Sequence, residues 1–249
     1  MSGYGRTKIT EIIRCWLDRM PIEEINLGRS KYVLYDGTYF HKEGCHISLM
    51  DARSQRTLSY IYAEKEGLDS THEWFGGLRQ AGLYPLYITM DGERAVMRVI
   101  REIWPKTKIQ RCLYHIQREG MRWLRTYPKT QAGRELRELL KTLCQIDSVE
   151  AKEAFISAYR GWLDNNGTFV KSLPWNIVAC KDLKRTMALL NNALPDMFHY
   201  LEDRKIPKTT NLMESYYSRL KADYRRHRGL SKRHRISYLA WYSFFHNHV

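Results

Sequence analysis

Residues 31–41 read Lys-Tyr-Val-Leu-Tyr-Asp-Gly-Thr-Tyr-Phe-His, and this run decides the fold. From Tyr32 to Phe40 the run is apolar on both faces, apart from the carboxylate of Asp36 in its middle. A strand that is apolar on both faces is typical of the centre of a sheet. The run therefore predicts a buried central strand that carries one acid.

Two more runs rich in β-branched and aromatic residues follow, at Cys45–Asp51 and Thr57–Ala63. Charged and small residues separate the three runs, which together predict a three-stranded meander. The next segment predicts a helix over 68–82, a strand over 83–90, a helix that stops at Pro105 and a strand over 108–114. This order predicts an α/β fold in which the later strands join the sheet by crossovers.

Helices are expected at the start of the chain and through most of its second half. Apolar residues from Ile9 to Met20 recur at helical spacing, and Pro21 ends this first helix. Between about residues 118 and 200 the strand pattern disappears and the leucines keep helical spacing. We expect an all-α insertion there, before a last helical region that begins near Asn211.

Basic residues dominate the charge of the chain. Lysine and arginine number 41 against 27 acids, a net charge of +14, and residues 204–235 alone hold 11 basic and two acidic residues. With 12% aromatic residues, this charge indicates a polyanionic partner, nucleic acid before membrane. No run reaches the roughly 18 apolar residues of a membrane-spanning helix, and the first residues lack an apolar signal region. We therefore expect a soluble, unexported protein.

Asp36 is the first candidate for chemistry. A buried carboxylate costs several kcal/mol unless a cation or a metal ion pairs with it, so an acid in a central strand is unusual. The alternative interpretation is a turn aspartate before Gly37, in a hairpin shorter than the one predicted.

Asp91 is the second candidate. It ends the apolar run 83–90 and precedes Gly92, so we expect it at the carboxyl end of a strand, where α/β proteins gather their ligand sites. Its alternative role is the N-cap of the following helix. Glu93 ranks lower, because one residue into that helix it is expected to point elsewhere.

Glu214 is the third candidate, on a helix expected over residues 211–226. It shares a face with Ser218, Lys221 and Arg225, so this acid is flanked by cations suited to phosphate groups. Its alternative role is a capping-box partner of Asn211. The expected buried stripe of this helix consists of Met213, Tyr216, Tyr217, Leu220 and Tyr224.

Three carboxylates backed by a basic helix fit two-metal phosphoryl chemistry. Mg²⁺ prefers oxygen ligands, and two ions about 3.5–4 Å apart stabilise both the attacking and the leaving oxygen of an in-line displacement. The sequence therefore favours Asp36, Asp91 and Glu214 as ligands of two ions, with the basic residues holding the DNA backbone.

Cys112 and His115 form a C-x-x-H segment, which is half of a zinc finger without a second ligand pair at the usual spacing. The five cysteines are scattered and include no C-x-x-C pair, which argues against a disulfide scaffold and favours a reducing compartment. We expect a packed cysteine and a histidine that faces the site or the substrate, with structural zinc as the weaker alternative.

The chain resembles the catalytic region of Mutator-type insertion-sequence transposases, a group related to plant Mutator-like elements. The resemblance covers roughly residues 31–245. It includes Arg219-Leu220-Lys221 and residues 226–230, which follow the last of the motifs given next. Its motifs, in order, are Tyr35-Asp36-Gly37-Thr38-Tyr39, Ile88-Thr89-Met90-Asp91-Gly92, Arg111-Cys112-Leu113-Tyr114-His115 and Thr209-Thr210-Asn211-Leu212-Met213-Glu214.

The resemblance implies a ribonuclease H-like mixed-sheet core with an all-α insertion before the last catalytic helix. The DDE triad of that family matches Asp36, Asp91 and Glu214, with Mg²⁺ or Mn²⁺ as its two ions. Cys112 and His115 match a family motif to which we assign a structural or DNA-positioning role. The implied activity is metal-dependent strand cleavage at transposon ends, followed by strand transfer into target DNA.

The expected division of the chain follows from this resemblance. Full members carry an N-terminal DNA-binding module, so we interpret residues 1–30 as a helical segment that is a remnant of one. Residues 31–117 form the first part of the core, 118–200 the helical insertion, and 201–249 the last part of the core with the basic helix.

The expected partner is double-stranded DNA, as transposon ends and target, bound by a homodimer or a larger assembly with no membrane contact. We expect a cytoplasmic, nucleoid-associated protein of a prokaryotic host. Tryptophans of the insertion (Trp123, Trp162 and Trp175) are expected in its core, with DNA contact as the alternative. The expected DNA-binding residues are Asn211, Arg219, Lys221, Arg225, Arg226, Arg228, Lys232 and Arg233.

Two other functions remain open from the sequence. One is a DNA-binding remnant or domesticated copy without catalysis, which uses the basic helix alone. The other is a related metal-dependent nuclease that cuts DNA strands but does not join them.

Overall fold

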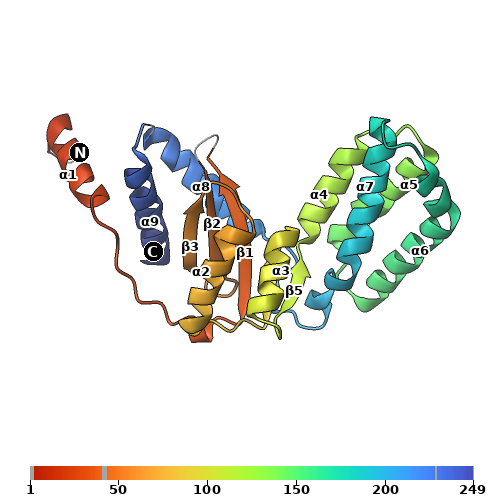
Figure 1. Cartoon of the computed structure of the whole chain (residues 1–249), viewed down its shortest axis with the longest axis horizontal. Helices are drawn as coiled ribbons and strands as arrows, with labels where there is room; N and C mark the ends of the chain where they lie inside the picture. Colours follow the sequence, from red (N-terminus) through yellow and green to blue (C-terminus); the bar gives the residue numbers. More distant parts are fainter. Residues whose placement is uncertain (1–2, 41–43, 228, 249) are drawn as a thin grey trace.

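The computed structural model describes residues 3–40, 44–227 and 229–248, and a five-stranded mixed sheet lies at its centre (Figure 1). The sheet has the order β3-β2-β1-β4-β5, in which β1 pairs antiparallel with β2 and parallel with β4. The α/β class, the meander and the central position of the first strand are confirmed. The strands are β1 (Tyr32–Tyr39), β2 (Cys45–Asp51), β3 (Thr57–Ala63), β4 (Tyr87–Met90) and β5 (Lys108–Arg111).

The strand predicted over residues 83–90 is shorter than expected. β4 begins at Tyr87, since Pro85 has no N–H to donate to a strand ladder. The N–H groups of Leu86 and Tyr87 both bind the carbonyl oxygen of Lys31, at 2.8 and 3.1 Å. β4 therefore begins where the chain first forms hydrogen bonds with the residue that precedes β1.

The strand predicted over residues 108–114 is also too long. β5 ends at Arg111, and Cys112 is the N-cap of helix α4 (Leu113–Leu124). The Leu113 N–H binds the carbonyl oxygen of Lys208 at 3.0 Å, so a contact with a distant segment turns the chain away from the sheet.

Helices cover both faces of the sheet (Figure 1). The side chains of β1 alternate between the two faces, so this strand contributes to the hydrophobic core on each side. Val33 and Tyr35 belong to the core under α2 and α3, whereas Leu34 belongs to the core under α8 and α9. The buried stripe of α8 is the predicted one. The bounds of these helices are α2 (Leu68–Gln80), α3 (Arg94–Ile103), α8 (Asn211–Tyr224) and α9 (Lys232–His248).

A separate group of helices, α4 to α7, lies beside the β5 edge of the sheet and has its own core (Figure 1). Trp162 is buried there and donates a hydrogen bond to the Ala132 carbonyl at 3.0 Å, as expected of a core residue. Trp123 is half-buried and Trp175 is exposed, so the expected core position is wrong for Trp175. Besides α4, the helices of this group are α5 (Gln131–Thr142), α6 (Val149–Ser172) and α7 (Val178–Ala193). Short 3₁₀ turns among the described residues are Leu27–Arg29, Leu143–Gln145, Leu194–Asp196, His199–Leu201 and Arg225–His227.

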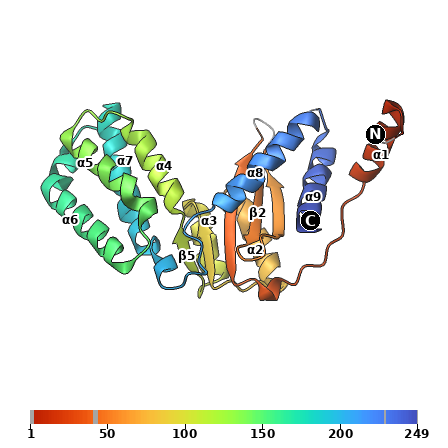
Figure 2. The ribbon, with the colours of Figure 1, turned by 180° about the vertical axis from the view of Figure 1, so that it is seen from behind.

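The first helix, α1 (Arg6–Leu17), stands away from the sheet and packs beside α9 (Figure 2). The Trp241 indole N–H donates to the Trp16 carbonyl at 3.0 Å, and the two rings meet edge to face. The helix ends at Leu17, before the predicted stop at Pro21, and Leu17 is its one buried residue. Within the described ranges, no helix is long and apolar enough to cross a membrane.

His46 of β2 is a buried polar side chain without a hydrogen-bond partner for either ring nitrogen among the described residues. The ring lies between those of Tyr60 and Tyr217. Burial lowers the pKa of His46 to about 3, so the folded protein holds the ring neutral at physiological pH. Unfolding restores the usual pKa of about 6.5, and below that pH the unfolded chain binds an extra proton.

The free energy of unfolding is therefore expected to fall as the pH drops from about 6.5 towards 3. His46→Leu should remove this loss, which amounts to about 2 kcal/mol at a pH of about 5. Urea denaturation of both proteins at about pH 5 and pH 8 measures it. A stability difference that is the same at both pH values would contradict a neutral buried ring.

Candidate active site

Asp36 lies in the middle of β1, opposite Ser48 of β2. Its side chain accepts a hydrogen bond from the Gly37 N–H at 2.9 Å, and its carbonyl oxygen accepts one from the Tyr217 hydroxyl of α8 at 2.6 Å. The Tyr217 hydroxyl also lies 2.6 Å from the Ser48 hydroxyl. The strand continues to Tyr39, so the alternative of a turn aspartate is wrong.

Asp91 directly follows β4, at the carboxyl end of that strand. The last paired residues of the parallel register are Leu34 of β1 and Thr89 of β4, and Asp36 and Asp91 each lie two residues further along. Asp91 is also the charge with the largest effect on the pKa of Asp36. Because side chains alternate along a strand, Asp36 lies on the same face as Leu34, which α8 covers. The two aspartates therefore come together beneath α8, as their positions in the sequence predict.

The turn after Asp91 is held by three contacts. The Asp91 side chain accepts the Glu93 N–H at 3.1 Å, and Arg111 Nε donates to the Asp91 carbonyl at 2.9 Å. The N-cap of α3 is Glu93, whose side chain accepts the Ala95 N–H at 3.3 Å. The alternative role of Asp91 as the helix N-cap is therefore wrong.

Glu214 lies in the first turn of α8 and faces α4. Its Oε1 is 3.1 Å from Arg118 Nη1 and 3.4 Å from His115 Nε2. The N-cap of α8 is Thr210, which makes no side-chain capping bond, so the alternative of a capping box with Asn211 is wrong. Glu214 instead connects α8 to α4, the first helix of the helical group.

The C-x-x-H segment lies beside Glu214. Cys112 Sγ is 3.2 Å from His115 Nδ1 and accepts the Thr210 N–H at 3.3 Å, so it joins the start of α4 to the start of α8. Burial raises the pKa of the Cys112 thiol, so the thiol is protonated at neutral pH. The expected packed cysteine and site-facing histidine agree with these contacts.

Glu66, between β3 and α2, is an acid at the site that the sequence does not single out. The Tyr35 hydroxyl donates to Glu66 Oε1 at 2.7 Å, and a methyl group on Gly37 would lie 3.3 Å from Glu66 Oε2. In the sequence Glu66 follows Glu64 and Lys65, a charged run typical of a solvated turn. The one available signal is Tyr35, a buried strand tyrosine whose hydroxyl needs a partner.

Burial and repulsion among these acids together set the electrostatics of the site. Burial raises the pKa of Asp36 well above its usual value, and the charges of Asp91, Glu66 and Glu214 raise it further. Burial also raises the pKa of Glu66 to about 7, against the lowering effect of the Tyr35 hydrogen bond. A cation bound among these carboxylates would relieve both effects.

Carboxylate oxygens are the donors that Mg²⁺ and Mn²⁺ prefer, so these acids are the residues suited to hold such ions. In the part of the chain that the structure describes, no three His, Cys, Asp or Glu side chains are already gathered as a metal site. Glu214 is engaged by Arg118 and His115 instead. The charges of Asp91, Glu66 and Glu214 therefore affect Asp36, but the four side chains do not form a closed set of metal ligands.

The expected DNA-binding residues lie on α8, on the turn after it and at the start of α9. Lys221 interacts with the acids: burial lowers its pKa, and attraction to Asp36 acts in the opposite direction. Arg233 donates to the carbonyl oxygen of Asp18 at 3.3 Å, and Arg228 lies outside the described residues. The exposed members of the set are Asn211, Arg219, Arg225, Arg226, Lys232 and Arg233.

The sequence model of the family described as "Transposase, Mutator family" matches residues 42–234. The chain belongs to the Mutator family of transposases. The resemblance to Mutator-type transposases is therefore confirmed, while no curated protein matches the chain. Of the candidate residues of this Mutator-family protein, Asp91, Cys112, His115 and Glu214 lie inside the matched range, and Asp36 precedes it.

Gly92 of this Mutator-family protein is expected to be sensitive to substitution. Its φ angle is +114°, and an added Cβ would collide with the guanidinium group of Arg111. Gly92→Ala should displace Arg111 from the Asp91 carbonyl and lower the free energy of unfolding by about 1–3 kcal/mol. Urea denaturation measures this loss.

Gly76→Ala in α2 is the matched control, because an added Cβ there meets no atom within 4 Å. Alanine favours a helix interior over glycine, so this variant should be as stable as the wild type or more stable. Equal destabilisation of the two variants would contradict the special role of Gly92.

Proposed function

We propose that this chain is a DDE-type DNA transposase that cleaves strands at transposon ends and joins them to target DNA. The parallel pairing of β1 with β4, together with the effect of the Asp91 charge on Asp36, carries the proposal. Glu214 comes from the first turn of α8, the helix whose Tyr217 binds the Asp36 carbonyl. The charges of Asp91 and Glu214 both act on Asp36, which supports a shared site for these three acids from remote parts of the sequence.

The fold supports the same proposal. The order β3-β2-β1-β4-β5, with an antiparallel meander, two parallel strands and helices on both faces, is in keeping with a ribonuclease H-like core. The helical group enters this core between the second aspartate and the glutamate. The resemblance to Mutator-type transposases implies an insertion at that place.

Asp36, Asp91 and Glu214 would hold two Mg²⁺ or Mn²⁺ ions, with Glu66 beside them. The all-oxygen donor set and the mutual repulsion of the acids fit a divalent cation. Bound ions lower the pKa of an attacking water and stabilise the leaving 3′-oxygen. Arg118, which donates to Glu214, and His115, whose Nε2 lies 3.4 Å from Glu214 Oε1, would orient this carboxylate, and Cys112 would fix the place of His115.

The test is strand cleavage and strand transfer on DNA that carries the ends flanking the element, with Mg²⁺, with Mn²⁺ or with chelator. Wild-type protein should cut and join in a metal-dependent manner. Asp36→Asn and Glu214→Gln should each abolish both activities and leave DNA binding intact, because each removes one metal-binding charge. The matched control is Glu138→Gln, an exposed acid on α5 that should act like the wild type.

Each other outcome would assign a different function to this protein. Cutting without joining would indicate a nuclease, and DNA binding without cutting in any variant would indicate a binding remnant. An Asp36→Asn variant that still cuts at the wild-type rate would remove Asp36 from the triad.

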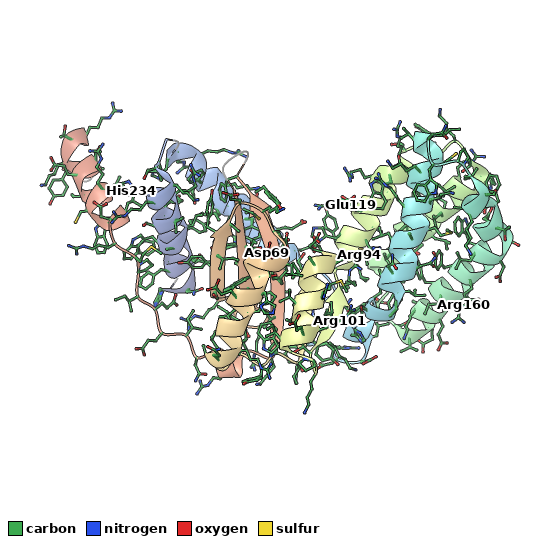
Figure 3. The ribbon with its side chains drawn as sticks, viewed as in Figure 1. Asp69, Arg94, Arg101, Glu119, Arg160 and His234 are labelled. Atoms are coloured by element: carbon green, nitrogen blue, oxygen red, sulfur yellow. The ribbon has the colours of Figure 1, made fainter. Side chains whose placement is uncertain are left out.

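Arg225 and Arg226, exposed at the end of α8, are proposed to contact DNA phosphates. Changing both to glutamine should weaken binding to every DNA sequence and reduce the slope of log affinity against log salt by about 2. Titrations at several salt concentrations measure the slope. Arg160→Gln with Lys171→Gln on α6 is the matched control, because both side chains are exposed on the helical group (Figure 3 labels Arg160). An affinity loss confined to one DNA sequence would show that this arginine pair reads bases.

A further inference from the structure

A cavity of about 750 Å³ lies at the junction between the sheet and the helical group, and five arginines line it. We call it the arginine pocket. Figure 3 shows two of these arginines, Arg94 and Arg101, on α3 near the helical group. The five are Arg94 and Arg101 of α3, Arg111 of β5, Arg122 of α4 and Arg185 of α7.

The arginine pocket carries more positive charge than the neighbouring acids neutralise. Arg94 and Arg111 take part in none of the ion pairs found among the described residues, although both line the pocket. The other three arginines each have one carboxylate partner: Arg101 with Asp196 at 3.2 Å, Arg122 with Glu119 at 2.6 Å and Arg185 with Asp182 at 3.8 Å.

Arg111 shows most clearly that the pocket is suited to an anion. Arg111 is only 6% exposed, and its Nε donates a hydrogen bond to the Asp91 carbonyl. Arg111 makes no direct ion pair with any described residue, and burial lowers its pKa, an effect that the charges of Asp91 and Asp196 only partly oppose. A bound anion would therefore stabilise this guanidinium further. Guanidinium groups match phosphate oxygens with paired, charge-assisted hydrogen bonds.

Trp123 adds an aromatic surface to the same pocket. It is half-buried, and the Arg185 guanidinium carbon lies 6.0 Å from the centre of its ring. Met97 and Leu189 line the cavity as well. Basic side chains combined with an aromatic ring are the usual means of binding single-stranded nucleic acid, and the volume suits a ligand of nucleotide size.

We propose that the arginine pocket binds one unpaired nucleotide of a DNA strand, with its phosphate on Arg94 and Arg111 and its base against Trp123. We place this nucleotide in the strand on which the carboxylates would act, because Gly92 lines the pocket and directly follows Asp91 in the chain. In this last respect the inference rests on the proposed function.

The test is fluorescence anisotropy with two DNA probes, a duplex with a single-stranded overhang and the same duplex fully paired. Chelator is present throughout, so that no strand is cut. Arg94→Gln and Trp123→Ala should each weaken binding to the overhang probe about fivefold or more, and to the paired probe less than twofold. Trp123→Phe, which keeps an aromatic ring, should retain most of the affinity.

Arg160→Gln, an exposed arginine of α6 outside the pocket, is the matched control and should bind both probes like the wild type. Unchanged binding of the overhang probe by Arg94→Gln and Trp123→Ala, or an equal loss for both probes, would overturn the proposal. So would inorganic phosphate that displaces the overhang probe as well as thymidine monophosphate does, since the site would then bind any anion.

These results are separate from those that test the proposed function. Binding is measured without metal ions, so an inactive protein can still prefer the overhang probe. If Asp36→Asn still cut DNA, the proposed triad would fail while the overhang preference stood.

Discussion

The structure is organised around a carboxylate that is held inside a central strand. Asp36 is half-buried, and burial together with the charges of Asp91, Glu66 and Glu214 raises its pKa. A domain is stable by only about 5–15 kcal/mol, so a cost of several kcal/mol at one residue is a large fraction of the total. Helix α8 holds this part of β1 in place, because the Tyr217 hydroxyl donates to the Asp36 main-chain carbonyl and lies 2.6 Å from the Ser48 hydroxyl.

Local patterns predicted the elements whose limits are set by their own residues. The bounds of β2 and β3 and the buried stripe of α8 follow from the spacing of apolar residues, which is visible in the sequence. The start of β4 and the end of β5 were wrong by several residues, since they depend on contacts with Lys31 and Lys208. Nothing within either strand indicates those partners.

The candidate site could be predicted where strand order alone brings residues together. Asp91 follows β4, which is parallel to β1, and the rule that ligand sites gather at strand ends predicted that position. Asp36 was instead singled out as an acid in a strand that is apolar on both faces. The contacts of Glu214 with α4 depend on how the helical group packs, and Glu66 depends on the hydroxyl of Tyr35. Such contacts join residues that are distant in the sequence and leave no periodic signal.

The helical group leaves the core and returns to it at nearly the same point. The Thr210 N–H binds Cys112 Sγ across a separation of 98 positions in the sequence, and the Leu113 N–H binds the Lys208 carbonyl. When the ends of a segment are fixed together, the entropy of closing it grows only with the logarithm of its length. An insert of quite different size could therefore evolve between these ends while β1, β4 and α8 kept their places.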